Sequence, residues 1–274
     1  MKNITLLATM ALVAMLLPGC KLSRHTDPED VFAKYTNKMG EQSIGDYDKD
    51  GTYTMGGASL DPSLVKGLSI DWLNDTVSVV SYDGSTVEIS EISADPLNDT
   101  TTMYYRLTPD GLLSVKFSKS GAALRSGSVP SKHLFVRVPR GHRLDEIEIN
   151  GLGQYIGIDS VVCGDIELNS VSNYLILNEC EVEDKVTVNT VNSLEFVASF
   201  SKLPREMEIN SVGSSATLYV PEDAGIELEV NGLSSDFHSE LPVVRKGQKR
   251  VIGNGECKIE CNSVCRQLDV KVKK

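Results

Sequence analysis

The chain has 274 residues, of which 41% are hydrophobic and 24% are charged, and its formal net charge is −11. Enough apolar side chains are present to form a buried core, which excludes wholesale disorder. The 22 glycines and 10 prolines are too few for a collagen-like or low-complexity chain. With 38 acidic and only 27 basic side chains, nucleic acid is excluded as a partner, because phosphates require neutralisation by lysine and arginine.

The first twenty residues have the pattern of a bacterial lipoprotein signal. After a positively charged start, the apolar run from Ile4 to Leu17 is too short to span a bilayer comfortably as a helix. It ends in Leu17-Pro18-Gly19-Cys20, which resembles a lipobox, the motif whose cysteine is lipidated after cleavage. We therefore expect residues 1–19 to be a signal peptide and a lipid on Cys20 to anchor the protein to a membrane. Lys21 follows instead of aspartate, which favours the outer membrane of the cell envelope with the leaflet undecided; an ordinary secretory signal is the alternative.

Residues 20–60 are predicted to form a tether with one short helix near Tyr35, and the tether contains half of a calcium-loop pattern. Asp46, Asp48 and Asp50 occupy positions one, three and five of such a loop. Position twelve, which requires a bidentate glutamate, is Gly57. Calcium is the only cofactor that the sequence suggests, and a solvated Asp/Gly turn is the better interpretation.

Residues 61–274 are predicted to form one all-β domain. Segments 69–72, 77–81 and 86–92 alternate apolar and polar residues, as half-buried strands do. Segments 104–107 and 113–117 flank a Pro-Asp-Gly turn and predict a hairpin. No segment after residue 60 has the period of a helix.

The most informative feature is a six-residue pattern of apolar, polar, apolar, asparagine, small and apolar residues. It occurs six times, and its asparagines are Asn150, Asn169, Asn189, Asn210, Asn231 and Asn262. They lie 19 to 21 residues apart, except for a last interval of 31. The two apolar residues form a short strand with one buried face, and the asparagine and its small neighbour turn the chain.

One such unit of about 20 residues cannot bury its own apolar face, so the units must stack. We therefore expect a single-stranded β-helix or β-solenoid, similar to a β-roll, in which the asparagines form a structural ladder through successive coils. An antiparallel sandwich with coincidental asparagine turns is the alternative. A terminal coil left exposed would favour dimers, unless the C-terminal strand, Leu268 to Val272, caps it.

The polar residue inside each repeat is glutamate in five of the six, and Thr187 in the third. These glutamates are Glu148, Glu167, Glu208, Glu229 and Glu260. In-register stacking would align them as an acidic stripe, in which like charges about 5 Å apart repel by about 0.8 kcal/mol per pair in water. A solvated face kept charged against aggregation is the better interpretation of such a stripe, and the binding of a divalent cation or a cationic partner is the alternative hypothesis.

Five cysteines follow Cys20: Cys163, Cys180, Cys257, Cys261 and Cys265. Cys180, Cys257 and Cys261 fall at inward positions and are expected to act as small buried apolar side chains. The envelope permits disulfides, and if one forms, Cys163 with Cys180 is the pair that the sequence favours. An odd number leaves at least one thiol free, and the spacing of the last three does not match a zinc site.

The repeats also resemble a known family. Asn169-Ser170-Val171-Ser172, the leading Gly67 to Trp72, the middle Leu134 to Pro139 and the closing Gly253-Asn254-Gly255 resemble the putative adhesin family of unknown function. The resemblance covers roughly residues 60–274 and implies a β-helical or β-roll domain of bacterial envelope lipoproteins. Its motifs are structural, so it implies no catalytic residue. The Ser-Gly turns that the family favours are few in this chain.

No catalytic motif is present, and the four histidines are scattered through the chain. We therefore predict a non-enzymatic, lipid-anchored envelope protein whose solenoid is a platform for adhesion or assembly, with a protein or polysaccharide partner. One alternative is a polysaccharide lyase or hydrolase on a parallel β-helix. Another is an envelope sensor that acts through a basic loop formed by Arg245, Lys246, Lys249 and Arg250.

Overall fold

The computed structural model describes residues 41–43, 45–125, 129–191, 195–213, 215–231, 236–264 and 267–273. The predicted signal peptide, Cys20, the predicted short helix and Cys265 lie outside this part of the chain. The described residues form an all-β structure that contains no α-helix, only the short 3-10 turn η1 (Pro62–Leu64). Among them, no helix is long and apolar enough to cross a membrane.

The strands follow one another along the chain with the following bounds. They are β1 (Glu41–Ser43), β2 (Thr54–Met55), β3 (Ala58–Leu60), β4 (Gly67–Trp72), β5 (Asp75–Tyr82), β6 (Val87–Ser93), β7 (Tyr104–Leu107), β8 (Leu112–Lys116), β9 (Ala123–Arg125), β10 (Lys132–Pro139), β11 (Arg143–Asp159), β12 (Val162–Val191), β13 (Glu195–Lys202), β14 (Glu206–Val212), β15 (Ser215–Val220), β16 (Ile226–Asn231), β17 (Asp236–Ser239), β18 (Val244–Lys246), β19 (Lys249–Ile252), β20 (Cys257–Val264) and β21 (Gln267–Val272). The predicted strands 69–72, 77–81 and 86–92 correspond to β4, β5 and β6, and the predicted hairpin corresponds to the antiparallel pair β7–β8.

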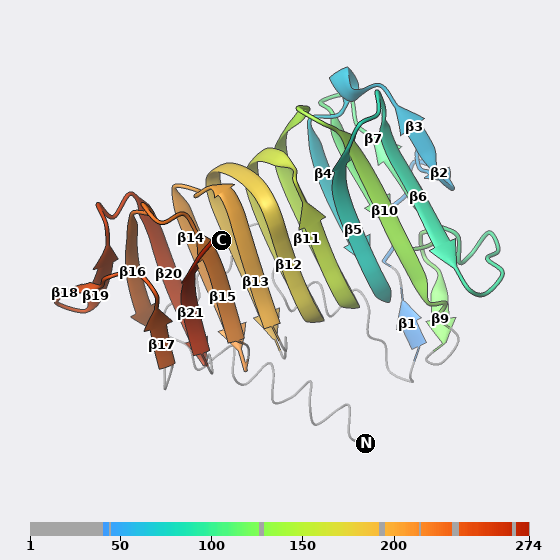
Figure 1. The fold of residues 1–274 in the computed structure, drawn as a ribbon. Coiled ribbons are helices and arrows are strands. Elements are labelled where there is room, and N and C mark those ends of the chain that lie inside the picture. Colours follow the sequence, from blue (N-terminus) through green and yellow to red (C-terminus); the bar gives the residue numbers. More distant parts are fainter. Residues whose placement is uncertain are drawn as a thin grey trace.

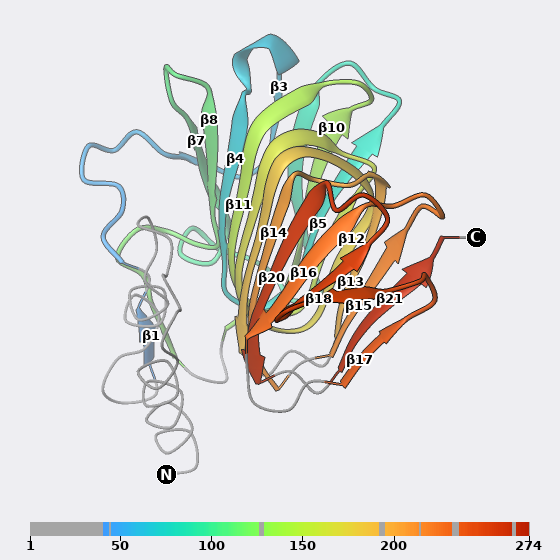
Figure 2. The ribbon, with the colours of Figure 1, turned by 90° about the vertical axis from the view of Figure 1, so that its left-hand side faces the viewer.

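The strands of the repeats form two parallel ladders, which lie along the molecule in Figure 1 and face each other in Figure 2. The first ladder contains β4, the first halves of β11 and β12, the end of β12, and then β14, β20 and β16. The second ladder contains β5, the later parts of β11 and β12, and then β13, β15, β21 and β17. All of these pairings are parallel and connect equivalent positions of the repeat.

The hydrophobic core lies between the two ladders. Ile147 and Ile149 fill it from the first ladder and Ile156 and Ile158 from the second, each at most 1% exposed. Along β14, for example, the alternation of the sequence buries every second residue and turns the others outward. Nineteen strands belong to one sheet that does not close. Within this sheet, each repeat contributes one strand to the first ladder and one to the second.

The last repeats do not stack in chain order. Strand β20 lies between β14 and β16, and β21 lies between β15 and β17. The prediction of successive coils is therefore wrong for the final two, and the C-terminal strand is enclosed on both sides instead of capping the stack. Beyond β16 the first ladder continues into the antiparallel hairpin β18–β19. This hairpin contains the predicted basic loop and takes up the free edge of β16, which leaves the inner side of β16 for β20.

The N-terminal part of the described chain is packed on this stack. The hydroxyl of Tyr47 donates to the backbone oxygen of Ser118 at 2.5 Å, and its ring meets that of Tyr53 edge-on. Burial raises the pKa of Tyr47 well above its ordinary value. The packed domain therefore begins before residue 61, because the end of the predicted tether already belongs to it.

A buried charge joins the strands at this end of the stack. Lys132 is fully buried, and its Nζ lies 2.7 Å from Oε2 of Glu91 and donates to the backbone oxygen of Thr101 at 2.7 Å. The same nitrogen lies 4.8 Å from the ring of Trp72, whose Nε1 donates to the Lys132 carbonyl at 3.1 Å. Burial lowers the pKa of Lys132 to about 8, and the negative charge of Glu91 opposes this effect. The ammonium group thus connects β6, β10 and the turn at residue 101.

Candidate functional site

The six repeat asparagines meet in one line along the first ladder. The side-chain amide of Asn169 donates to Oδ1 of Asn150 at 3.0 Å, and Asn189 donates to Oδ1 of Asn169 at 2.8 Å. The line continues from Asn210 to Asn189, from Asn262 to Asn210 and from Asn231 to Asn262, at 2.8, 3.2 and 3.2 Å. Every amide donates in the same direction along the stack, and Asn231 is the last member because β20 is inserted before β16.

A carboxylate takes the first place in the asparagine ladder. Asn150 donates to Oδ1 of Asp71 at 2.9 Å, and the other oxygen of Asp71 forms an ion pair with Lys116. Strand β4 pairs in register with β11, so that Asp71 lies opposite Asn150. We did not predict this residue, although Leu68-Ser69-Ile70-Asp71 matches the repeat pattern with aspartate in place of asparagine. A carboxylate can only accept, which suits the end of a chain of donors.

The glutamates of the predicted acidic stripe also align in register on the outside of the first ladder. Glu148 pairs with Glu167, Thr187 with Glu208, and Glu260 lies between Glu208 and Glu229. Their oxygens accept from the asparagine ladder: Asn150, Asn169 and Asn210 each donate to the glutamate two residues earlier at 3.0 Å. Both N–H groups of such an amide are thereby used, one between adjacent strands and one within its own strand. These glutamates of the acidic stripe therefore stabilise the asparagine ladder by accepting hydrogen bonds from it.

Lysines pair with carboxylates of the acidic stripe and with the outward carboxylates two residues before it on the same strands. Lys185 lies 2.9 Å from Oε2 of Glu208, and Lys249 lies 2.6 Å from Oε1 of Glu227. Burial opposes ionisation of Glu208, but hydrogen bonds from Asn210 and Lys185 outweigh it and hold the pKa of Glu208 below its usual range. At the other end of the stripe, Glu146 lies two residues before Glu148. Its pKa is raised mainly by burial, and in addition by the neighbouring carboxylates. The negative charge is thus concentrated on β11 and the first half of β12.

The described residues contain no group of three or more histidine, cysteine, aspartate or glutamate side chains placed to hold a metal ion. In the calcium-loop pattern, Oδ1 of Asp48 accepts from the backbone of Thr52 at 2.7 Å, and Oδ1 of Asp46 accepts from Ser120 at 3.1 Å. The Asp48 carboxylate therefore stabilises the turn in which Asp50 lies, and the Asp46 carboxylate connects this segment to Ser120.

The four described cysteines, Cys163, Cys180, Cys257 and Cys261, are free and buried. The favoured disulfide between Cys163 and Cys180 is therefore wrong for this structure. Burial raises the pKa of Cys180 to about 11 and that of Cys257 to about 12. Such thiols act as small apolar side chains of the core.

A serine and a histidine that are far apart in the sequence meet on the second ladder. Oγ of Ser78 lies 2.9 Å from Nε2 of His133, because β10 pairs in register with β5. The His133 ring stacks on Phe135, with 3.7 Å between the ring centres. The nearby carboxylate of Asp75 accepts instead from the hydroxyl of Thr76 at 2.9 Å and from that of Ser131. The Ser78 hydroxyl and the His133 ring therefore form a pair and not a catalytic triad.

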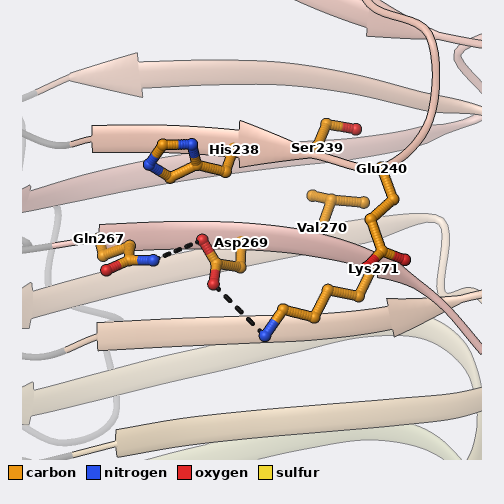
Figure 3. Close-up of a pocket in the computed structure, with 7 residues that line it drawn as sticks. All are labelled: His238, Ser239, Glu240, Gln267, Asp269, Val270 and Lys271. Atoms are coloured by element: carbon orange, nitrogen blue, oxygen red, sulfur yellow. Dashed lines mark hydrogen bonds and ion pairs between the residues drawn. The ribbon is translucent and has the colours of Figure 1, made fainter.

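A polar cleft of about 410 Å³ lies where β17 and β21 run side by side (Figure 3). Its lining residues are His238, Ser239, Glu240, Gln267, Asp269, Val270 and Lys271. Gln267 donates to Oδ1 of Asp269 at 2.8 Å, and Nζ of Lys271 lies 3.5 Å from Oδ2 of the same carboxylate. This set of donors and acceptors can bind a polar ligand of modest size. We did not predict the cleft, because its two strands come from segments 31 residues apart.

No family model matches the chain, and no curated protein does either. Among solved structures, a putative cell adhesion protein from Clostridium sporogenes is 11% identical, covers 81% of this chain and 100% of its own, and superposes with a TM-score of 0.44. A putative adhesin from Bacteroides fragilis is 10% identical, covers 79% of this chain and 97% of its own, and has a TM-score of 0.29. At these identities and TM-scores the likeness assigns no function.

Proposed function

We propose that this protein is a non-enzymatic binding platform of the cell envelope, anchored by a lipid on Cys20, which serves adhesion or assembly. In this proposal the stacked repeats act as a β-solenoid whose length sets the reach of the platform. The supporting observation is the in-register stacking of outward side chains along both ladders. Equivalent positions recur at each strand, about 4.8 Å apart. A polymer or an extended surface would meet the same contacts again at each step.

Two kinds of link between neighbouring repeats make such a platform rigid. The amide ladder connects repeats through hydrogen bonds outside the core, and the apolar residues connect them inside it. Because both links run through neighbouring repeats, bending the stack would break several contacts at once. A rigid face loses little conformational entropy when a partner binds.

The test combines retention with cleavage. Purified protein would be passed over immobilised mannan, laminarin, mucin, fibronectin and collagen, and each polysaccharide would be assayed for newly released reducing ends. Retention on at least one of these probes without cleavage is the expected result. Failure to bind any of them would overturn the platform, and cleavage would overturn its non-enzymatic character.

The anchor has a separate test. Cells expressing the full chain would be labelled with a radioactive fatty acid and fractionated, with Cys20→Ser as the variant. We expect label and membrane association in the unaltered protein and the loss of both in the variant. Equal membrane association of the two proteins would remove lipidation from the proposal.

A hydrolase is the second candidate function, and the contact between Ser78 and His133 favours it. A serine nucleophile needs a base within hydrogen-bond distance, and this pair satisfies that condition. Hydrolysis of p-nitrophenyl acetate that disappears in Ser78→Ala would support the hydrolase. Equal background rates in both proteins would exclude a role of Ser78 as nucleophile.

A further inference from the structure

Aromatic side chains gather on the outside of the second ladder. His133 on β10, Thr76 on β5, Tyr155 on β11 and Tyr174 on β12 lie in register across four adjacent strands. Phe135 follows in the next outward row, which continues over Ser78 and Gly157. We call this surface the aromatic face: His133, Phe135, Tyr155 and Tyr174, with the small residues Thr76, Ser78 and Gly157 among them.

The hydroxyl end of the Tyr155 ring lies over Gly157. A Cβ atom added to Gly157 would lie 2.5 Å from the hydroxyl oxygen of Tyr155 and 2.6 Å from its Cε1, so the ring covers the glycine. Tyr174, on the adjacent strand, is 43% exposed. Adjacent strands are about 4.8 Å apart, which places the two tyrosines side by side on the surface. The space that a side chain at residue 157 would occupy is therefore taken by the Tyr155 ring, on the outer side of the sheet.

Hydrogen-bonding groups border the rings. Asn178 is exposed and donates to Oδ1 of Asp159 at 3.1 Å, two rows further along the same strands. On the other side lies the Ser78 hydroxyl in contact with His133. Arg137, on β10 two residues after Phe135, is paired with Glu88 at 3.5 Å. The border of the aromatic face is therefore polar, and the carboxylate of Asp159 gives it a negative charge.

We propose that the aromatic face binds an uncharged polysaccharide chain, an inference that rests on the proposed platform function. Tyrosine rings on an outer sheet surface can pack against the C–H face of a pyranose, and amide, hydroxyl and carboxylate groups beside them match sugar hydroxyls. The negative charge of Asp159 disfavours acidic polysaccharides. The row from His133 to Tyr174 crosses three strand intervals, or about 14 Å, which is long enough for several sugar units.

The experiment is affinity electrophoresis of the purified protein in native gels that contain mannan, laminarin or galactomannan, with heparin as the acidic control. Retardation by at least one neutral polysaccharide and none by heparin is expected. Tyr174→Ala should weaken the apparent affinity about tenfold, and Tyr174→Phe should keep most of it because the ring remains. Gly157→Ala should act like Tyr155→Ala, because its Cβ displaces the ring without removing it.

Two controls keep folding and location apart from binding. Met55→Ala removes an exposed apolar side chain from β2, and Glu208→Gln alters the first ladder; both should bind as the unaltered protein does. Circular dichroism checks that every variant is folded. Absence of retardation by all three neutral polysaccharides overturns the inference, while retention on fibronectin, mucin or collagen would leave the platform intact. Retardation that survives both Tyr155→Ala and Tyr174→Ala also overturns it.

Discussion

The asparagine ladder predicts that one substitution has different effects at its middle and at its end. Asn169 is 4% exposed; it donates to Asn150 and Glu167 and accepts from Asn189. Asn169→Ala removes all three bonds. It leaves the oxygen of Asn150 without its ladder donor and one N–H of Asn189 without its acceptor, both in a nearly dry environment.

The expected loss follows from these two groups. A buried polar group that loses its partner costs about 1–3 kcal/mol, so two such groups lower the free energy of unfolding by about 3 kcal/mol in Asn169→Ala. Asn231 ends the ladder, is exposed, and donates at 3.2 Å to Asn262 and at 3.4 Å to Glu260. Its replacement by alanine leaves one buried group without its ladder donor, the oxygen of Asn262, which is 7% exposed, and should therefore cost about half as much, about 1.5 kcal/mol.

The assay is urea denaturation followed by circular dichroism and by the fluorescence of Trp72, which is 1% exposed and the only tryptophan of the chain. Because stacked repeats can unfold in parts, coincidence of the two signals is required before free energies are compared. Asn169→Asp is a further variant: its carboxylate keeps an acceptor for Asn189 but faces Glu167, so its loss of stability relative to the unaltered protein should be larger at pH 7 than at pH 4. Equal losses in Asn169→Ala and Asn231→Ala would refute the reasoning.

Three other predictions concern ionisable side chains that are buried or lie close to like charges. Lys132→Met leaves the Glu91 carboxylate without its cation and should lower the free energy of unfolding by about 3–5 kcal/mol in urea denaturation, with partial recovery when Glu91→Gln is added; an unchanged midpoint would contradict the ion pair. Glu146→Gln should raise the melting temperature at pH 7. The raised pKa of Glu146 means that its charge opposes folding above that pKa, so the gain should vanish as the pH falls below the ordinary value of a glutamate, and a gain that persists in acid would contradict the charge cluster. Cys180 and Cys257 should resist iodoacetamide at pH 8 in the native protein and react in urea; mass spectrometry that detects native alkylation would contradict their burial.

The repeat pattern predicted the local elements of this protein well. Alternation of apolar and polar residues depends only on neighbouring positions, so the strands and the inward position of Ile147 and Ile149 could be predicted from the sequence. The meeting of the asparagines could be predicted for a similar reason, since repeats of one pattern stack with equal positions opposite each other.

The candidate binding surfaces could not be predicted in this way. The cleft requires Asp269 and His238 to be opposite each other, and the Ser78–His133 contact requires β10 to pair with β5 across 55 residues. No local pattern encodes which distant strands become neighbours. The position of the Tyr155 ring over Gly157 likewise depends on side-chain packing, which the sequence pattern does not specify.

By itself, the sequence determined the β-class of the domain, the repeat and the set of residues in the asparagine ladder, because these depend on spacing along the chain. Only the tertiary structure decided the order of the last repeats and placed Asp71 and its partner Lys116 at the start of the ladder. The physical reason is that all repeats share one pattern, so Asn262 fits equally well on either side of Asn231. The choice is made by the hairpin β18–β19, which takes the outer edge of β16 and leaves only its inner edge for β20.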